Sequence, residues 1–242
     1  MQPNFGMQLR DGETLVGVFC AIYSDQRIDG TLQRFCNPHS WCVLDAYRNS
    51  AITLALQLLR QRDYHFTMFT PNQKVAKVFL GLRFRLLDDS LLYLPNLPSP
   101  WPRRGARFLE TDATQIACRL EGAALAEFNA HRSIPWLNFV AFGRKGDACL
   151  AIYKRERWKR MACAWIMHLS DHGAMERHGG LLHHHLLTRG GMPVSRIEGR
   201  FLNSVPSLAF RTRRTQPKLV SSRTLSDAQI RDVYSELMTL DL

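Results

Sequence analysis

Residues 40–53 combine an apolar strand, a tight turn and a helix start, an arrangement that can bind an anion. The strand SWCVL (40–44) runs into the turn, and small residues at Ser50 and Ala51 open the following helix. Unpaired backbone N–H groups at a helix start attract anions, and the helix dipole adds to the attraction. Arg48 can donate a charged hydrogen bond to the same phosphates. The segment predicts a pyrophosphate-binding turn, and the alternative is an ordinary strand-turn-helix connection.

A second segment of chemical interest begins at Asn72, directly after Thr-Pro. Val75, Val78, Phe79 and Leu82 then recur at helical spacing, which predicts a helix with one apolar face. A short apolar strand is expected before Asn72, so the chain alternates strand, helix, strand, helix across both segments.

The first segment resembles the pyrophosphate loop of the GNAT superfamily of acyl-CoA N-acyltransferases. That loop reads Arg/Gln-x-x-Gly-x-Gly/Ala after a Val-x-Pro-x-Tyr-Arg lead. The lead is matched at Val43, Tyr47 and Arg48, whereas Ala51 and Thr53 stand in place of the two glycines.

The second segment resembles the next motif of the same superfamily, Asn-x-x-Ala-x-x-x-Tyr-x-x-x-Gly-Phe, and is aligned from Asn72 without a gap. The resemblance covers residues 12–90 and implies that two central strands splay apart, with the pantetheine of an acyl-CoA in the gap. It implies acetyl-CoA or another acyl-CoA as cofactor. The cofactor-binding residues would be Val43, Leu44, Arg48, Asn49, Ser50, Ala51, Ile52, Thr53, Asn72 and Phe79.

Further positions depart from the superfamily pattern. Asp45 replaces the proline of the lead, Arg83 replaces the glycine before the last Phe, and Phe79 replaces the tyrosine that can protonate the leaving CoA thiolate. Phe cannot donate a proton, so any acyl transfer would depend on positioning and on backbone amides. His39, just before strand 40–44, is a candidate general base, and a surface histidine in a turn is the alternative.

The spacing of apolar residues predicts a mixed α+β protein, and the resemblance implies a GNAT-like central sheet flanked by helices. Strands are expected at Leu15–Tyr23, Thr31–Phe35 and Ser40–Leu44, and four prolines between 93 and 105 interrupt the pattern. We therefore expect two GNAT-like units in tandem, with an acyl-CoA-binding unit at 1–92, a proline-rich linker at 93–107 and a second unit at 108–242.

The second half repeats the order of elements without repeating the sequence. A hairpin is expected from Trp136–Phe142 and Ala148–Tyr153, followed by a strand at Met161–Leu169 and a helix at 173–188. Ser226 and Gln229 fit a capping box, which predicts a C-terminal helix at 226–240. The Arg-x-x-Gly-x-Gly/Ala pattern is absent after residue 169, so this half is expected to shape the acceptor pocket or to support the first half.

The net charge of +11 attracts polyanions, either nucleic acid, an anionic membrane surface or a phosphorylated cofactor. Basic residues cluster at 103–107, 154–160 and 211–214 without forming a long basic tail. Because no helix-turn-helix, zinc-finger or RNA-binding signature accompanies them, nucleic acid is disfavoured as a partner.

The composition is that of a globular protein, with 45% hydrophobic and 22% charged residues among 242. The six cysteines form no Cys-x-x-Cys pair, and no apolar run is long enough to span a membrane. With no secretory signal either, we expect a cytoplasmic protein. His168 and His172 are four residues apart, but at a strand end and a loop, so we expect no metal site.

Three hypotheses follow. The first is an acyltransferase that moves an acyl group from an acyl-CoA, acetyl-CoA in the first instance, to an amine or other nucleophile of an unknown acceptor. The second is a non-catalytic acyl-CoA-binding protein on the same fold, favoured by the replaced tyrosine and glycines. The third is a basic protein associated with nucleic acid. The acceptor, the acyl chain length and the oligomeric state are left open by the sequence.

Overall fold

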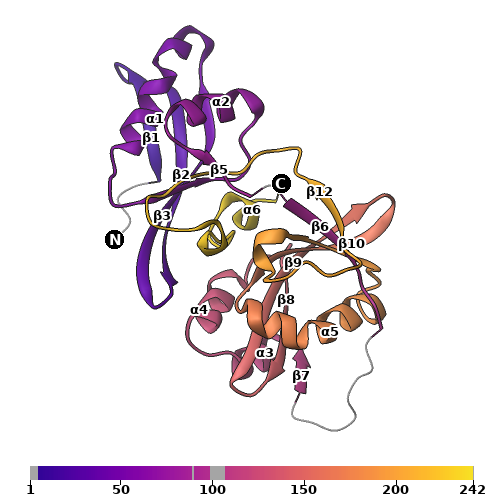
Figure 1. Cartoon of the computed structure of the whole chain (residues 1–242). Coiled ribbons are helices and arrows are strands. Elements are labelled where there is room, and N and C mark those ends of the chain that lie inside the picture. The colour runs from indigo at the N-terminus through magenta and orange to yellow at the C-terminus, as the bar shows by residue number, and fades with distance from the viewer. Residues whose placement is uncertain (1–4, 89, 99–106, 242) are drawn as a thin grey trace. The chain divides into compact units, whose positions relative to one another are not determined.

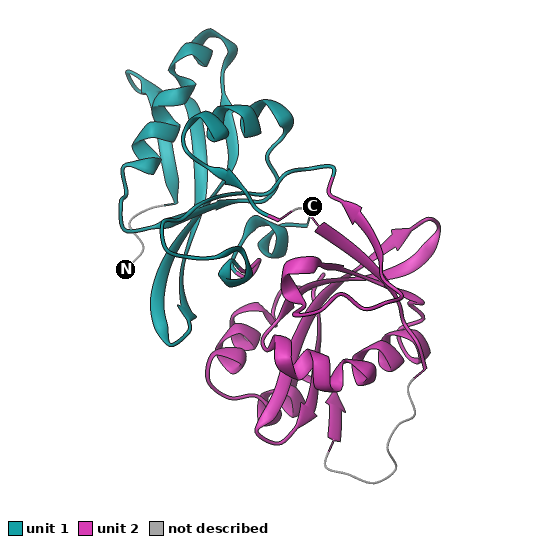
Figure 2. Cartoon of the chain, viewed as in Figure 1, with its two compact units in different colours: residues 1–87, 215–230, 234–242 teal, residues 88–214, 231–233 magenta. Residues whose placement is uncertain are grey.

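The computed structural model describes residues 5–88, 90–98 and 107–241. Two compact units divide the chain, as Figure 2 shows. Unit 1 consists of residues 1–87, 215–230 and 234–242, and unit 2 of residues 88–214 and 231–233. Each unit is a mixed sheet with helices packed on it, which confirms the predicted α+β class.

Unit 1 is built on a six-stranded sheet with the order β1-β2-β3-β4-β13-β5 (Figure 1). Strands β1 to β3 pair antiparallel, and β4 is parallel to β3. The strands are β1 (Gly6–Asp11), β2 (Thr14–Ile28), β3 (Thr31–Val43), β4 (His65–Met68), β5 (Arg85–Leu86) and β13 (Leu219–Ser221).

The single strand β3 replaces the two short strands expected at Thr31–Phe35 and Ser40–Leu44. An extra residue, Ser40, has no partner on β2 and adopts a positive φ of 50°. This β-bulge lets the chain continue as one strand while changing which side chains face each way. Trp41 thus packs on the same core as Cys36, although the two are five positions apart on the strand, an odd number.

Strands β3 and β4 separate soon after they pair. Their register contains only two pairs, Phe35 with His65 and Cys36 with Phe66, although β3 continues to Val43. The parallel strands therefore splay apart next to the bulge. Such an opening exposes backbone groups that neither strand satisfies, which is where a ligand or another segment can bind.

Helices α1 (Ala51–Leu59) and α2 (Gln73–Gly81) cover one face of this sheet. Each forms where the apolar residues recur at helical spacing. Leu54 and Leu58 of α1 and Phe79 of α2 are at most 1% exposed and pack in one core with the strands.

Unit 2 is built on a seven-stranded sheet with the order β12-β6-β11-β10-β9-β8-β7. Its strands are β6 (Ser90–Pro95), β7 (Arg107–Glu110), β8 (Asn138–Arg144), β9 (Asp147–Trp158), β10 (Met161–Leu169), β11 (Val194–Glu198) and β12 (Phe210–Arg213). Strand β11 is parallel to β10, and the other pairs are antiparallel. The predicted hairpin and the predicted strand at Met161–Leu169 are confirmed.

The helices of unit 2 pack on both faces of its sheet. Helix α5 (His172–Thr188) packs in one core with Val140, whereas Phe128 of α4 (Gly122–His131) contacts Phe139, the next residue along β8. Since neighbouring residues on a strand face opposite ways, α5 and α4 lie on opposite faces. Helix α3 (Ala113–Arg119) precedes α4.

The sheet of unit 1 contains a strand that the chain supplies from outside the unit's main segment. In unit 1, β13 lies between β4 and β5 and follows all the strands of unit 2. In unit 2, β6 lies between β11 and β12 and belongs to the unit's main segment. Unit 1 thus receives one strand from beyond unit 2, and we call this return of β13 the strand exchange.

This exchange changes the predicted division of the chain. Residues 93–95, expected in the linker 93–107, belong to β6, which bonds to two neighbours; residues 99–106 lie outside the described residues. Most of the segment after Arg214, expected in the second unit, completes the first. Proline at the strand end is tolerated because β6 needs no ladder donor there.

The expected C-terminal helix at 226–240 is also replaced. The capping box of Ser226 and Gln229 is present, but it begins a one-turn 3₁₀ helix, Asp227–Gln229. The remaining helical part is α6, Glu236–Thr239. Tyr234, between them, has a positive φ of 59°, which interrupts any continuous helix.

Candidate functional site

The predicted pyrophosphate turn is a 3₁₀ helix, Asp45–Ser50, that continues directly into α1. The amide of Ala51 donates to the carbonyl of Arg48, so this donor of the turn is already used. The guanidinium of Arg48 lies 2.8 Å from the carboxylate of Asp45, and 74% of its side chain is exposed. The turn therefore presents Arg48 to solvent with a local acidic partner.

The other residues expected at the cofactor lie around this turn. Val43 ends β3 and Leu44 caps the 3₁₀ helix, Asn49 and Ser50 end that helix, and Ile52 and Thr53 are exposed in the first turn of α1. The structure thus brings the residues from 43 to 53 together on one connection.

Asn72 and Phe79 have structural roles in α2. The side-chain oxygen of Asn72 accepts the amide of Val75 at 2.9 Å and so caps the helix. The ring of Phe79 is fully buried and contacts the rings of Phe19, Trp41 and Phe84. As placed, this ring belongs to the core of unit 1 and does not line an open cleft.

His39 lies on β3 directly before the bulge. Its Nδ1 is 2.9 Å from the hydroxyl of Ser40, and burial lowers its pKa below the usual value. It shares a strand face with Asn37, two residues earlier, opposite the face that packs on α1 and α2.

Glu236 of α6 reaches the opening between β3 and β4 from a distant part of the chain. Its Oε1 accepts the amides of Phe69 at 2.9 Å and Thr70 at 3.0 Å, and the Thr70 hydroxyl at 3.1 Å. Its own amide donates to Oδ1 of Asn37 at 2.9 Å, and Nδ2 of Asn37 donates to the carbonyl of Thr67 at 2.9 Å. Glu236 therefore bridges the two strands where their own pairing has ended.

The second carboxylate oxygen of Glu236 is unusual. The residue is 1% exposed, and Oε2 has no hydrogen-bond partner within the described part of the chain. Burial raises the pKa of this carboxyl, and it outweighs the hydrogen bonds from Phe69, Asn37 and Thr70 that favour the charged form. A buried carboxylate oxygen without a partner costs stability, and carboxyl groups with shifted pKa values concentrate at functional sites.

No local sequence signal identifies Glu236. It lies within the stretch expected to be an ordinary C-terminal helix, and its partners are more than 160 residues away in the sequence. Only the strand exchange that carries residues 215–230 back into unit 1 brings this carboxylate to the opening.

Unit 2 has paired charges at the end of β11. Strands β10 and β11 share three register pairs and then separate, and β10 also carries a bulge. The guanidinium of Arg200 pairs there with Glu198 at 2.7 Å and with Asp232 at 2.5 Å, all three at most 7% exposed. Because these charges satisfy one another, they form a structural network.

The start of α5 is also occupied. A carboxylate oxygen of Asp171 accepts the amide of Ala174 at 2.6 Å, so a negative charge already stands where a phosphate would bind. This arrangement agrees with the missing glycine pattern after residue 169.

Two further properties concern the described ranges only. Nowhere in residues 5–88, 90–98 and 107–241 do three His, Cys, Asp or Glu side chains gather into a group that could hold a metal ion. Over the same ranges, no helix has both the length and the apolar character needed to cross a membrane.

Comparison with known proteins relates the chain to others through structure alone. No family model and no curated protein matches its sequence. It is similar to a GCN5-related N-acetyltransferase from Anabaena variabilis, with 13% identity, a TM-score of 0.54, and coverage of 88% of this chain and 61% of that one. It is also similar to one from Kribbella flavida, with 12% identity, a TM-score of 0.55, and 88% and 59% coverage.

A third similar structure is Eis1 from Mycobacterium abscessus, with 11% identity, a TM-score of 0.53, and 91% and 65% coverage. The chain spans less than two thirds of the length of each of these structures. The mixed sheets with helices packed on them agree with these matches. This chain has the fold of the GCN5-related N-acetyltransferases.

Proposed function

We propose that unit 1 binds an acyl-CoA and transfers its acyl group to an amine, with Glu236 as the general base. The observation that carries the proposal is the buried carboxylate with one unpartnered oxygen, held between β3 and β4 where they splay apart. A fold built around a costly unpaired group favours a chemical role for that group.

The reaction follows from this placement. The amine nitrogen attacks the thioester carbonyl, the new C–N bond forms as the C–S bond breaks, and CoA leaves as a thiolate. The carboxylate of Glu236 takes the proton that the amine loses. Because its pKa is raised by burial, it is a better base than an ordinary glutamate.

The bulge and the splay supply the second requirement. Ser40 has no partner on β2, and β3 leaves β4 after Cys36, so the backbone of residues 37–43 is available to a ligand on that side. Backbone donors fixed in this way can stabilise the oxyanion that forms at the thioester. In this proposal Arg48, on the exposed turn, contacts the CoA phosphates.

The six unpaired cysteines favour a reducing compartment, the cytoplasm, for this reaction.

A second candidate is acyl-CoA binding without turnover. The observation in its favour is the packing of Trp41 against Phe19 and Phe79, at ring-centroid distances of 5.0 and 5.7 Å, on the helix side of the opening. Phe79 also lacks the hydroxyl that could protonate a leaving thiolate.

The test measures CoA release from acetyl-CoA and longer acyl-CoAs with a panel of amines, for the wild type and for Glu236→Gln. We expect Glu236→Gln to lower kcat by about 10²- to 10⁴-fold, the usual contribution of a general base. Glu236→Gln should still bind acyl-CoA, as measured by calorimetry. Equal turnover by both proteins would remove Glu236 from the mechanism, and binding without any turnover would support the second candidate.

Glu13→Gln is the matched control. Glu13 is an exposed carboxylate of unit 1 in the turn between β1 and β2. The Glu13→Gln variant should release CoA at the wild-type rate.

A further inference from the structure

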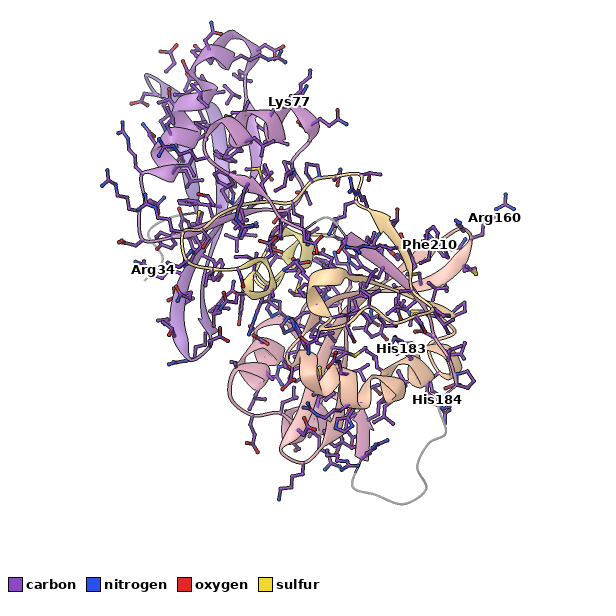
Figure 3. The ribbon with its side chains drawn as sticks, in the orientation of Figure 1. Arg34, Lys77, Arg160, His183, His184 and Phe210 are labelled. Carbon is purple, nitrogen blue, oxygen red and sulfur yellow. The ribbon has the colours of Figure 1, made fainter. Side chains whose placement is uncertain are left out.

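Unit 2 contains an apolar cavity of about 410 Å³, formed by the end of β6, the middle of α5 and the loop before β12. Leu94 and Leu97 line it from the β6 side, Pro206 and Leu208 from the loop, and His183 from α5. Cavities of this size with apolar walls and few polar groups are typical of small-molecule sites. Figure 3 shows His183 and Phe210 on the elements that border this region.

His183 is the titratable side chain in this lining, and its orientation is fixed. Its Nδ1 lies 2.7 Å from Oδ1 of Asn96, which is 3% exposed. The same Oδ1 accepts the hydroxyl of Ser195 at 2.7 Å, and Nδ2 of Asn96 donates to the carbonyl of Met192 at 2.7 Å.

These contacts determine where the imidazole carries its proton. If the Asn96 amide were turned over, its oxygen would face the Met192 carbonyl, and two acceptors would meet. Oδ1 is therefore the acceptor, and Nδ1 of His183 must be the donor. Burial also lowers the pKa of His183 to about 4, so the ring is neutral near pH 7.

Nε2 of His183 is then an unprotonated acceptor in an apolar cavity. Nδ1 is committed to Asn96, so Nε2 is the ring nitrogen left to accept from a ligand in the cavity that His183 lines. A ligand that donates to Nε2 gains one neutral hydrogen bond there.

The cavity is separate from the proposed acyl-transfer site. It lies in unit 2 next to Pro95, which pairs with Val194 at the start of β11, whereas β3, β4 and Glu236 belong to unit 1. Its polar anchor, Asn96, bonds to Pro193 and Met192, which precede β11.

We propose that this cavity is a binding site for a small uncharged molecule with an apolar body and one hydroxyl, which donates to Nε2 of His183. A ring-bearing alcohol or phenol fits the apolar walls and the acceptor Nε2, and Ser207 is the other residue of the lining with a polar side chain. A carboxylate does not fit, because it would face the lone pair of Nε2 without a cation beside it.

The probe is 4-propylphenol, and propylbenzene, which lacks the hydroxyl, is its matched partner. Calorimetry on the full chain should show 4-propylphenol binding about three- to tenfold more tightly, the range expected for one neutral hydrogen bond. His183→Phe should abolish this preference while keeping the cavity apolar. His184→Ala is the control, because His184 is the next residue of α5 and lies outside the described lining (Figure 3).

Nitrogen NMR of the His183 ring gives a readout that does not depend on a variant. The wild type should show a proton on Nδ1 and a bare Nε2, and the Nε2 resonance should shift when 4-propylphenol is added. A proton on Nε2, equal affinity for the two probes, or loss of the preference in His184→Ala would each overturn the proposal. So would the absence of 4-propylphenol binding up to its solubility limit.

Discussion

The carboxyl of Glu236 should make the stability of the protein depend on pH in a way that Glu236→Gln removes. Burial raises its pKa in the folded state above the ordinary value of 4.5. The folded chain therefore holds this proton more tightly than the unfolded chain. Its contribution to stability is complete below about pH 4.5 and is lost as the pH rises towards the folded-state pKa.

The size of the effect follows from how much more tightly the folded chain holds the Glu236 proton than the unfolded chain does. Each tenfold increase in proton affinity on folding is worth about 1.4 kcal/mol of unfolding free energy across this pH range. Gln at this position keeps an oxygen for the amides of Phe69 and Thr70 but does not titrate. Glu236→Ala instead leaves two backbone donors without an acceptor, and we expect it to cost about 2–6 kcal/mol at every pH.

The assay is urea unfolding of the wild type, Glu236→Gln and Glu236→Ala between about pH 4.5 and 8. The unfolding free energy of Glu236→Gln minus that of the wild type should rise with pH. Comparing the two proteins cancels all other titrating groups, and Glu13→Gln should follow the wild type. A difference that stays constant with pH would refute the raised pKa, and with it the basis for treating Glu236 as a base.

Three other outcomes are expected. Arg48→Ala should weaken acyl-CoA binding in calorimetry by about 1.5–3 kcal/mol, and Asp45→Asn, which frees the guanidinium, should strengthen it; neither should move the melting temperature, because the pair is exposed. An unchanged affinity in both variants would place the phosphates elsewhere. Phe79→Tyr should lower unfolding free energy by about 1–3 kcal/mol without raising CoA release, because the new hydroxyl is sealed in the core. A variant as stable as the wild type would mean that the ring edge reaches solvent. By circular dichroism and NMR, residues 1–87 alone should not form the native sheet, whereas the same residues linked to 215–241 should, because only the second protein contains β13. A folded 1–87 would show that β13 is dispensable.

The sequence predicted the elements whose signals are local. Helix α1 and helix α2 follow from apolar residues at helical spacing, and the strand at Met161–Leu169 is found as expected. The acetyltransferase-like sheet was predicted from the resemblance of residues 40–53 and 72–84 to two superfamily motifs, together with the order of the elements.

What the sequence could not predict depends on distant contacts. Whether β6 or β13 joins one sheet or the other is decided by pairing across more than a hundred residues, for which no single-sequence signal exists. The role of Glu236 depends on the same exchange, and Ser40 gave no sign that one bulged strand would replace two. Motif matching placed Phe79 at the cofactor, which stays a prediction, and the packing of its ring with three other aromatic rings had no signal in the sequence.

The exchanged strand β13 also constrains how the chain is made. During translation β4 and β5 emerge from the ribosome first, and residues 88–214 must be synthesised before β13 can emerge. At about 5–20 residues per second, this interval lasts on the order of ten seconds. Throughout it, the apolar strand His65–Met68 has an open hydrogen-bonding edge, which invites pairing with other nascent chains. Unit 1 must therefore complete its sheet after unit 2 has been translated, and its yield in cells should depend on a chaperone that shields this edge.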